Sequence, residues 1–210
     1  MNLMSNILLF YTFLIIYAIL IMEGTMKTDL GKKTILYPMP VLMVGTYDKK
    51  GKPDLMAAAW GGIFNDNMVC LCLDKSHKTV ANLKERKAFT VAVADADHVT
   101  ECDYVGIVSA YEESDKLAKA GLTANKSANV DAPVIEELPL TLECQLVSYD
   151  DSTEQAVGNI INVIADDSIL TGGKVDPAKL KAITYDPVNH TYIQLGKVVG
   201  KAFSVGKKLR

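Results

Sequence analysis

The sequence predicts a mainly β protein, an antiparallel barrel interrupted by a few helices. Apolar and β-branched runs are separated by clusters rich in Gly, Pro and Asp, as in chains built of consecutive strands. Two of these runs, Leu140–Ser148 and Ala156–Ala165, are long enough to be central strands. Regular alternation of strands and helices is absent, and no G-x-G-x-x-G follows a strand, so a Rossmann fold is not expected.

Each extended run ends at a turn or at a helix signal. The first is closed by residues 48–53 (DKKGKP), whose charges, glycine and proline are typical of a turn. Alternation in residues 68–73 (MVCLCL) would place every second side chain on one face of a strand. The predicted strands are Val41–Tyr47, Asp54–Trp60, Met68–Leu73, Phe89–Ala94, Leu140–Ser148, Ala156–Ala165 and a closing segment, Tyr192–Phe203.

Helical spacing and helix-end signals occur between these strands. Apolar residues three and four apart indicate a helix with one buried face, and glycine marks a helix end. An aspartate followed by proline is typical of a helix start. The predicted helices are Thr79–Arg86, with Val80, Leu83 and Ala81 facing inward, two within residues 96–122, the second being Ser114–Ala120 closed by Gly121, and a short helix opened by Asp176-Pro177.

The composition fits one domain with an appendage. The chain has 210 residues, against about 150 for a typical domain. It is 49% apolar and 22% charged, so it can bury an ordinary core. The formal net charge is −3, and the basic footprint of a general nucleic-acid binder is missing. We therefore expect no nucleic-acid partner.

Residues 1–25 form an apolar N-terminal segment that precedes the predicted domain, residues 26–210. Residues 1–22 carry no charge and could reach about 30 Å as a helix, enough to cross a bilayer. A secretory signal is disfavoured because there is no basic region before the apolar run. A membrane anchor followed by lysines would keep the domain in the cytoplasm.

The alternative is a misassigned start, with translation beginning at Met26. The codons for Met22-Glu23-Gly24 must read AUG-GAR-GGN, which contains a purine run placed like a bacterial ribosome-binding site. We favour this alternative. Both readings predict a cytoplasmic domain, and only the first predicts contact with a membrane.

The cysteine and histidine usage argues against a metal centre. Cys70 and Cys72 are spaced C-x-C, with Cys102 and Cys144 far away in sequence, which is poor spacing for zinc. We expect four reduced, small core residues, as is usual in the cytoplasm. A three-histidine site would need every histidine in the chain. No metal is predicted.

The segment 74–79 (DKSHKT) joins a predicted strand to a predicted helix. Free backbone amides at a helix N-terminus attract anions, and here hydroxyls and cationic side chains accompany them. These groups could hold one phosphate. Alternatively, a hydroxyl caps the helix and the lysines are merely solvated. The candidate residues are Ser76, His77, Lys78 and Thr79.

Two further segments combine small residues with polar neighbours. In residues 56–62 (MAAAWGG) three alanines precede the only tryptophan, so a flat ligand could approach the backbone closely; tight strand–helix packing is the alternative. Residues 103–110 (DYVGIVSA) indicate a loop pressed against another element. Lys116 could supply positive charge or pair with an acid on its own helix. The candidates are Ala57, Ala58, Ala59, Trp60, Ser109 and Lys116.

Taken in order, these segments resemble the flavin reductase-like family of FMN-binding split barrels, most closely its flavoredoxin-type branch. Residues 54–60 look like the family's Asn-x-x-Ala-x-Ala-Trp segment, and Lys78-Thr79 looks like its Arg/Lys-x-Thr phosphate signature. Residues 103–122 look like its D-x-x-G-x-x-S-G…D-K…G-L stretch. The resemblance covers roughly residues 35–205, and the order of the motifs makes it specific.

The sequence departs from the family pattern in three places. Asp54 stands where Asn is usual, and Ala92 and Ala94 occupy the stretch in which an Asn is usual. Glu154-Gln155 replaces an Asp-His pair, so a proton-relay role for that histidine is not carried over. Flavin binding tolerates these changes more easily than a specific reductase activity does.

The resemblance implies a six-stranded antiparallel barrel that forms a homodimer, with one FMN per subunit. The residues at 76–79 would hold the phosphate, and Ala57–Trp60 would offer backbone contacts to the isoalloxazine edge. Ser109 and Lys116 would lie near the ring, where donors or positive charge favour its reduced form. No side chain is predicted to be catalytic.

The implied function is an FMN-dependent oxidoreductase that takes electrons from NAD(P)H and passes them to a small-molecule or protein acceptor. Bound flavin carries out the redox chemistry, and the protein orients it. Two alternatives stay open. One is a non-enzymatic FMN-binding electron carrier; the other is a split-barrel module that binds haem.

Overall fold

The computed structural model describes residues 12, 13 and 27–210. The chain divides into two units, residues 1–34 and residues 35–210. In the first unit, residues 27–34 form no helix or strand and are exposed. The predicted apolar segment 1–25 lies outside the described residues, apart from Thr12 and Phe13. Over the part of the chain that is described, no helix has both the length and the apolar character needed to cross a membrane.

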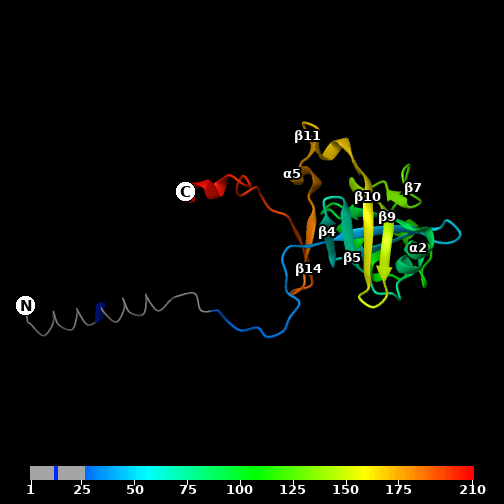
Figure 1. The fold of residues 1–210 in the computed structure, drawn as a ribbon, viewed down its shortest axis with the longest axis horizontal. Helices are drawn as coiled ribbons and strands as arrows, with labels where there is room; N and C mark the ends of the chain where they lie inside the picture. Colours follow the sequence, from blue (N-terminus) through cyan, green and yellow to red (C-terminus); the bar gives the residue numbers. More distant parts are fainter. Residues whose placement is uncertain (1–11, 14–26) are drawn as a thin grey trace, which may run out of the picture. The chain divides into compact units, whose positions relative to one another are not determined.

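A seven-stranded antiparallel sheet is the framework of the second unit (Figure 1). Its order is β3-β2-β6-β9-β10-β5-β4. The longest pair, β9 and β10, forms a central hairpin with bulges at Val157/Gly158 and Ile160/Asn162. The strands are β2 (Leu42–Tyr47), β3 (Pro53–Ala58), β4 (Gly61–Asn65), β5 (Met68–Cys72), β6 (Ala88–Val93), β9 (Leu140–Asp150) and β10 (Gln155–Ala165).

The sheet curls into a half-barrel because its two edge strands are neighbours in sequence. β3 and β4 lie at opposite ends of the strand order, yet only Ala59 and Trp60 separate them along the chain. Two residues span a short distance, so both edges must lie close together. The Trp60 carbonyl also accepts a 2.8 Å hydrogen bond from the amide of Cys72, the last residue of β5, which is the partner strand of β4.

Short strands and helices surround this sheet. β1 (Met39–Pro40), β13 (Ile183–Asp186) and β14 (Thr191–Gln194) form a three-stranded sheet. Two small hairpins pair β7 (Ala124–Lys126) with β8 (Pro133–Ile135) and β11 (Leu170–Thr171) with β12 (Lys174–Val175). The helices are α2 (Lys78–Arg86), α3 (Val99–Ile107), α4 (Lys116–Lys119), α5 (Pro177–Leu180) and the 3₁₀ turns η1 (Asp167–Ile169) and η2 (Val205–Leu209).

Two buried apolar clusters hold the helices on the sheet. One joins Met43 and Leu55 of the sheet to Val105 of α3 and Leu117 of α4. The other includes Leu83 of α2 and Phe89 of β6. Both clusters contain residues of β2 and β3, so these strands are packed on both faces.

The expected fold class, mainly β with helical inserts and a split-barrel sheet, is confirmed, and the described sheet has seven strands where six were expected. Several details were wrong. Ala81 is exposed because the buried face of α2 runs through Thr79, Val80, Asn82 and Leu83. The closing strand ends at Gln194, where pairing with β13 ends, and residues 195–203 form neither helix nor strand.

Candidate functional site

Where the loop after β5 enters α2, two backbone amides have no acceptor among the residues that the structure describes. His77 is the N-cap of α2 and makes no side-chain capping bond, so the first-turn amides of Lys78 and Thr79 have no intrahelical acceptor. Asp74 shapes the loop, because its Oδ1 accepts hydrogen bonds from the Ser76 hydroxyl at 2.6 Å and the Ser76 amide at 2.8 Å. These bonds lower the pKa of Asp74. The Ser76 hydroxyl is therefore already engaged.

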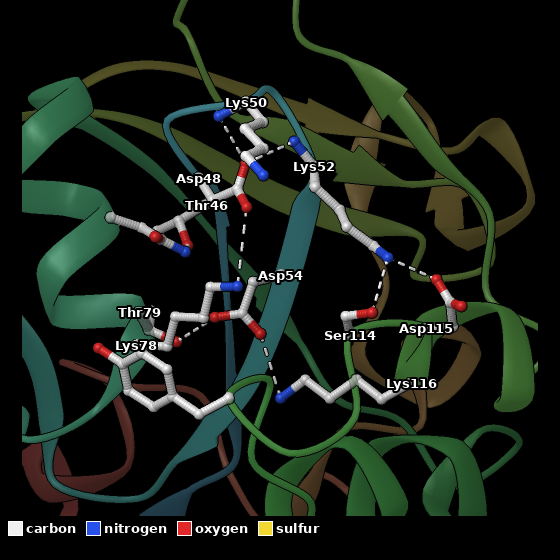
Figure 2. A network of polar contacts seen from close by, with 12 residues as sticks. Thr46, Asp48, Lys50, Lys52, Asp54, Lys78, Thr79, Ser114, Asp115 and Lys116 are labelled. Atoms are coloured by element: carbon white, nitrogen blue, oxygen red, sulfur yellow. Dashed lines mark hydrogen bonds and ion pairs between the residues drawn. The ribbon is translucent and has the colours of Figure 1, made fainter.

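Lys78 lies beside this loop with an ammonium group that is only loosely paired. Its Nζ is 3.7 Å from Asp48 Oδ2 and 5.9 Å from the centroid of the Tyr111 ring. Burial acts to raise the pKa of Asp48, but the amides of Lys52 and Lys50 and the charge of Lys78 lower it overall. Asp48 thus stays ionised and holds Lys78 near the α2 N-terminus (Figure 2).

A buried polar cluster lies under the same helix end. Asp54 on β3 and Lys116 on α4 are each 3% exposed, and Lys116 Nζ lies 3.1 Å from Asp54 Oδ1. The Thr79 hydroxyl donates a 2.7 Å hydrogen bond to Asp54 Oδ2 (Figure 2). The structure thus joins two sequence-predicted residues, Thr79 and Lys116, through an aspartate that sequence reasoning did not include.

Lys116 occupies a fixed position because three oxygen-bearing groups on two other elements hold its ammonium group. It donates hydrogen bonds to the carbonyl oxygens of Val105, at 3.0 Å, and Val108, at 2.9 Å, at the C-terminal end of α3. Asp54 neutralises its charge from β3. The charge of Lys116 is therefore neutralised by Asp54 and adds little net positive charge to the surroundings. Its acidic partner lies on β3, and not on its own helix as one reading of the sequence suggested.

These groups line a pocket of about 160 Å³. The pocket brings together five of the predicted site residues. Three of them, His77, Lys78 and Thr79, lie at the N-terminus of α2, and the others are Ser109 and Lys116. Ser109 is exposed, and its Oγ accepts a hydrogen bond of 3.2 Å from the Tyr111 amide, which leaves its proton free to be donated. The lining residues are Asp54, Met56, His77, Lys78, Thr79, Gly106, Ile107, Val108, Ser109, Ala110 and Lys116.

A second, larger pocket of about 470 Å³ shares Met56 and His77 with the first. It lies where the two sheet edges meet and contains the whole predicted Ala57–Trp60 segment. Ser76 lines neither pocket. The lining residues are Met56, Ala57, Ala58, Ala59, Trp60, Cys72, Leu73, Asp74, His77, Thr153, Glu154 and Tyr185.

Small residues bring α3 close to β3 at this point. A Cβ added to Gly106 would lie 2.8 Å from the Ala57 Cβ, a separation that side chains do not tolerate. The segment 103–110, expected as a loop pressed against another element, belongs mostly to α3, and the element it presses on is β3. Gly106 and Ala57 thus set the spacing between the helix and the strand.

Sequence reasoning missed Asp54, Met56 and Tyr185 as pocket residues. Asp54 carried a usable signal, since it is a charged residue within an otherwise apolar extended run. Tyr185 lies on β13 in another sheet, and no local pattern relates it to β3. Among the described residues, no three histidine, cysteine or acidic side chains gather in a geometry that could hold a metal ion.

The curled antiparallel sheet, with a two-part pocket at its seam, defines a split-barrel protein. Residues 34–182 match the family described as the flavin reductase like domain, which is more than two thirds of the chain. The chain belongs to this family. A curated relative, an uncharacterized protein of Archaeoglobus fulgidus, is 28% identical over 141 residues, which cover 65% of this chain and 78% of that protein.

Solved structures give the same result. Flavoredoxin of Desulfovibrio vulgaris (Miyazaki F) superposes with a TM-score of 0.83 and 38% identity, covering 86% of this chain and 100% of the other. Flavoredoxin from Methanosarcina acetivorans superposes with a TM-score of 0.80 and 28% identity, covering 89% of this chain and 100% of the other. The fold similarity therefore extends over the full length of both flavoredoxins.

Proposed function

We propose that this protein binds flavin mononucleotide in the two adjoining pockets and acts as a flavin-dependent oxidoreductase. The observation that carries the proposal is the pairing of a small polar pocket, at a helix N-terminus, with a larger pocket lined by Ala57–Trp60. Membership of the flavin reductase like domain family and the likeness to two flavoredoxins support it.

The smaller pocket offers donors that fit a phosphate group. The amides of Lys78 and Thr79 are free of intrahelical acceptors, and a helix N-terminus favours an anion. Lys78 adds a positive charge whose nearest acid is 3.7 Å away. Ser109 and His77 border the same space and can each donate a proton in a hydrogen bond.

The larger pocket offers a backbone edge and small side chains, which fit a flat ring system. β3 is an edge strand of the sheet, so alternate backbone groups point away from β2 and are available to a ligand. The three alanines leave these groups uncovered. FMN, when bound, supplies the electron-transfer chemistry, and these residues orient its ring.

We further propose that NAD(P)H is the electron donor and that a small molecule or a protein is the acceptor. We expect the protein to form a homodimer and to be located in the cytoplasm.

A second candidate is an electron carrier that no nicotinamide reduces, and the likeness to flavoredoxins favours it. Purified protein should be yellow in either case. Steady-state oxidation of NAD(P)H with free flavin or a ferric acceptor separates the two.

Replacement of Lys78 and Thr79 by alanine tests the phosphate position. Lys78→Ala removes one charge-assisted contact, which contributes at most about 1.5–3 kcal/mol, and Thr79→Ala removes the hydroxyl that fixes Asp54 beside the same pocket, so the double variant should bind FMN several-fold to a hundredfold more weakly. Lys84→Ala is the matched control, because Lys84 lies on the same helix but pairs with Asp151, outside both pockets. Unchanged affinity in the double variant would show that the phosphate binds elsewhere.

A further inference from the structure

The segment that follows β14 exposes large apolar side chains. Residues 195–210, the C-terminal arm, begin where β14 ends, and Figure 1 shows them in red, leading away from the sheets. Val198, Val199, Phe203 and Leu209 are 81%, 94%, 99% and 94% exposed. Large apolar side chains that are exposed together mark an interaction surface.

The C-terminal arm is ordered within itself. The amides of Ser204 and Val205 donate hydrogen bonds to the Lys201 carbonyl, at 3.2 and 3.1 Å. A Cβ added to Gly200 would lie 2.8 Å from Val205 Cγ1, so these residues pack closely on each other. Among the described residues, no hydrogen bond or ion pair joins residues 196–210 to the chain before them. The arm therefore has a local shape but no surface of its own protein that holds it.

The arm is basic, whereas the rest of the chain is acidic. It contains five of the 22 lysines and arginines and none of the 25 acidic residues, so the other residues carry 17 basic against 25 acidic groups, a formal charge of −8. An anionic membrane would attract the arm but repel this body. An acidic protein surface such as its own body fits the arm better. The basic residues are Lys197, Lys201, Lys207, Lys208 and Arg210.

A groove with matching chemistry lies between α3 and β14. This α3–β14 groove has a volume of about 400 Å³, and its side chains are apolar or aromatic apart from Thr100 and Asp103. Ile107 in its wall is 75% exposed. The groove therefore fits an apolar side chain with a lysine beside it. The lining residues are Val99, Thr100, Asp103, Tyr104, Ile107 and Tyr192.

The α3 wall of the groove carries negative charge. Residues 95–107 contain four acidic side chains and no lysine or arginine. Two of the four are paired with a histidine or a lysine. The other two, Glu101 and Asp103, have no ion-pair partner among the residues that the structure describes, although Asp103 accepts a 2.7 Å hydrogen bond from the Tyr192 hydroxyl. Both carboxylates are therefore available to a basic partner.

We propose that the C-terminal arm docks in the α3–β14 groove of a second copy of this chain, with its apolar side chains in the groove and its lysines beside Glu101 and Asp103. Strand β14 ends at Gln194, where the arm begins, and also supplies Tyr192 to the groove. The root of each arm thus lies beside the groove that receives the partner's arm. Two copies related by a two-fold axis can exchange arms over a short distance, and both contacts form together. The contact is specific to this homodimer and does not depend on flavin binding.

The test measures the Kd of the dimer by sedimentation equilibrium. Phe203→Ser should raise this Kd about 100-fold or more, because each dimer loses two buried phenylalanines. The variant should fold normally, since Phe203 is 99% exposed in the single chain. Asp103→Lys in the groove should raise the Kd at least about tenfold by repelling the arm. Val175→Ser, a half-exposed residue of β12, is the control and should leave the Kd unchanged.

Cross-linking tests where the arm lies. One chain carries Thr100→Cys and a second chain, with a longer tag, carries Phe203→Cys, both in a background in which the exposed Cys72 is replaced by serine. A short bismaleimide should join the two different chains, because the groove and the arm in each contact belong to different copies. Lys174→Cys on β12, used in place of Thr100→Cys, is the control and should give little product.

Three results would overturn the inference: equal dimer Kd values for wild type and Phe203→Ser, a wild-type protein that remains monomeric, or no product between Thr100→Cys and Phe203→Cys. Arm-dependent binding of a monomer to phosphatidylglycerol vesicles would also overturn it, by assigning the arm to a membrane. Flavin binding is measured separately by fluorescence. A protein that exchanges arms but binds no FMN would overturn only the proposed function.

Discussion

Lys116 and Asp54 form an ion pair in which each side chain is only 3% exposed, and the pair connects α4 to β3 beneath the N-terminus of α2. Each side chain can stay charged in the interior only because the other is present, since an unpaired buried charge is very unfavourable. The pair therefore links the stability of the fold to the geometry of the smaller pocket.

Removing one member of this pair should be far more damaging than removing an exposed pair. We expect Lys116→Met to lower the free energy of unfolding by about 3–5 kcal/mol, because Asp54 stays buried without a counter-ion. Lys52→Met, which breaks the exposed pair with Asp115, should change it by about 0–1 kcal/mol. Urea unfolding measures both. A Lys116→Met protein as stable as Lys52→Met would disprove the importance of the pair.

The contact between Gly106 and Ala57 should give compensating substitutions. Gly106→Ala places a Cβ 2.8 Å from that of Ala57, and such overpacking typically destabilises by about 1–3 kcal/mol. Adding Ala57→Gly frees the space, so the double variant should be more stable than the two single effects predict. Gly62→Ala is the control, since nothing lies within 4 Å of its added Cβ. Strictly additive effects would contradict the contact.

Glu143 should make the fold sensitive to acid. Burial acts to raise the pKa of Glu143, but hydrogen bonds from Ser127, Asn162 and Asn129 lower it below the ordinary value of 4.5. A carboxyl with a lowered pKa in the folded state stabilises above its unfolded pKa, and the contribution is lost as pH falls through the folded pKa.

Urea unfolding between pH 7 and pH 3 measures this effect. The wild-type protein should lose stability on acidification below about pH 4.5, and Glu143→Gln should show a flatter profile at the cost of about 1–3 kcal/mol at pH 7. A profile in the variant as steep as that of the wild type would assign the acid sensitivity to other groups.

The four cysteines should differ sharply in reactivity. Burial raises the pKa of Cys102 and of Cys144 to about 12, so these thiols stay protonated. Cys72 is exposed and lines the larger pocket, which corrects the expectation that it lies in the core. Iodoacetamide at pH 8 should therefore label Cys72 quickly and spare the buried pair, as read by peptide mass. Saturating FMN should slow the labelling of Cys72, and Cys72→Ser should abolish the fast phase.

The strands could be predicted because their signal is local. Alternation at residues 68–73 and the long apolar runs of β9 and β10 depend on neighbours in sequence, and the structure places strands there. The same local signal failed at residues 195–203, because a strand also needs a partner, and the pairing of β14 stops at Gln194. The strand preference of a segment does not show whether a partner strand is available to pair with it.

The candidate site could be predicted only in part. The residues 77–79 and Ala57–Trp60, which line the two pockets, stand in contiguous motifs, so sequence reasoning could single them out as candidates. Asp54 and Lys116 are 62 positions apart, and their pairing depends on how α4 packs on β3. A single sequence contains no local sign of such a contact.

The join between β3 and β4 also limits how the barrel can move. Only Ala59 and Trp60 bridge the seam, so the Cα atoms of Ala58 and Gly61 can never be more than about 11 Å apart. The two sheet edges are thus tethered at this point and cannot separate there. A molecule that enters the seam beside Ala59 and Trp60 must therefore pass between individual side chains, and its rates of entry and exit at this point should be set by small local motions.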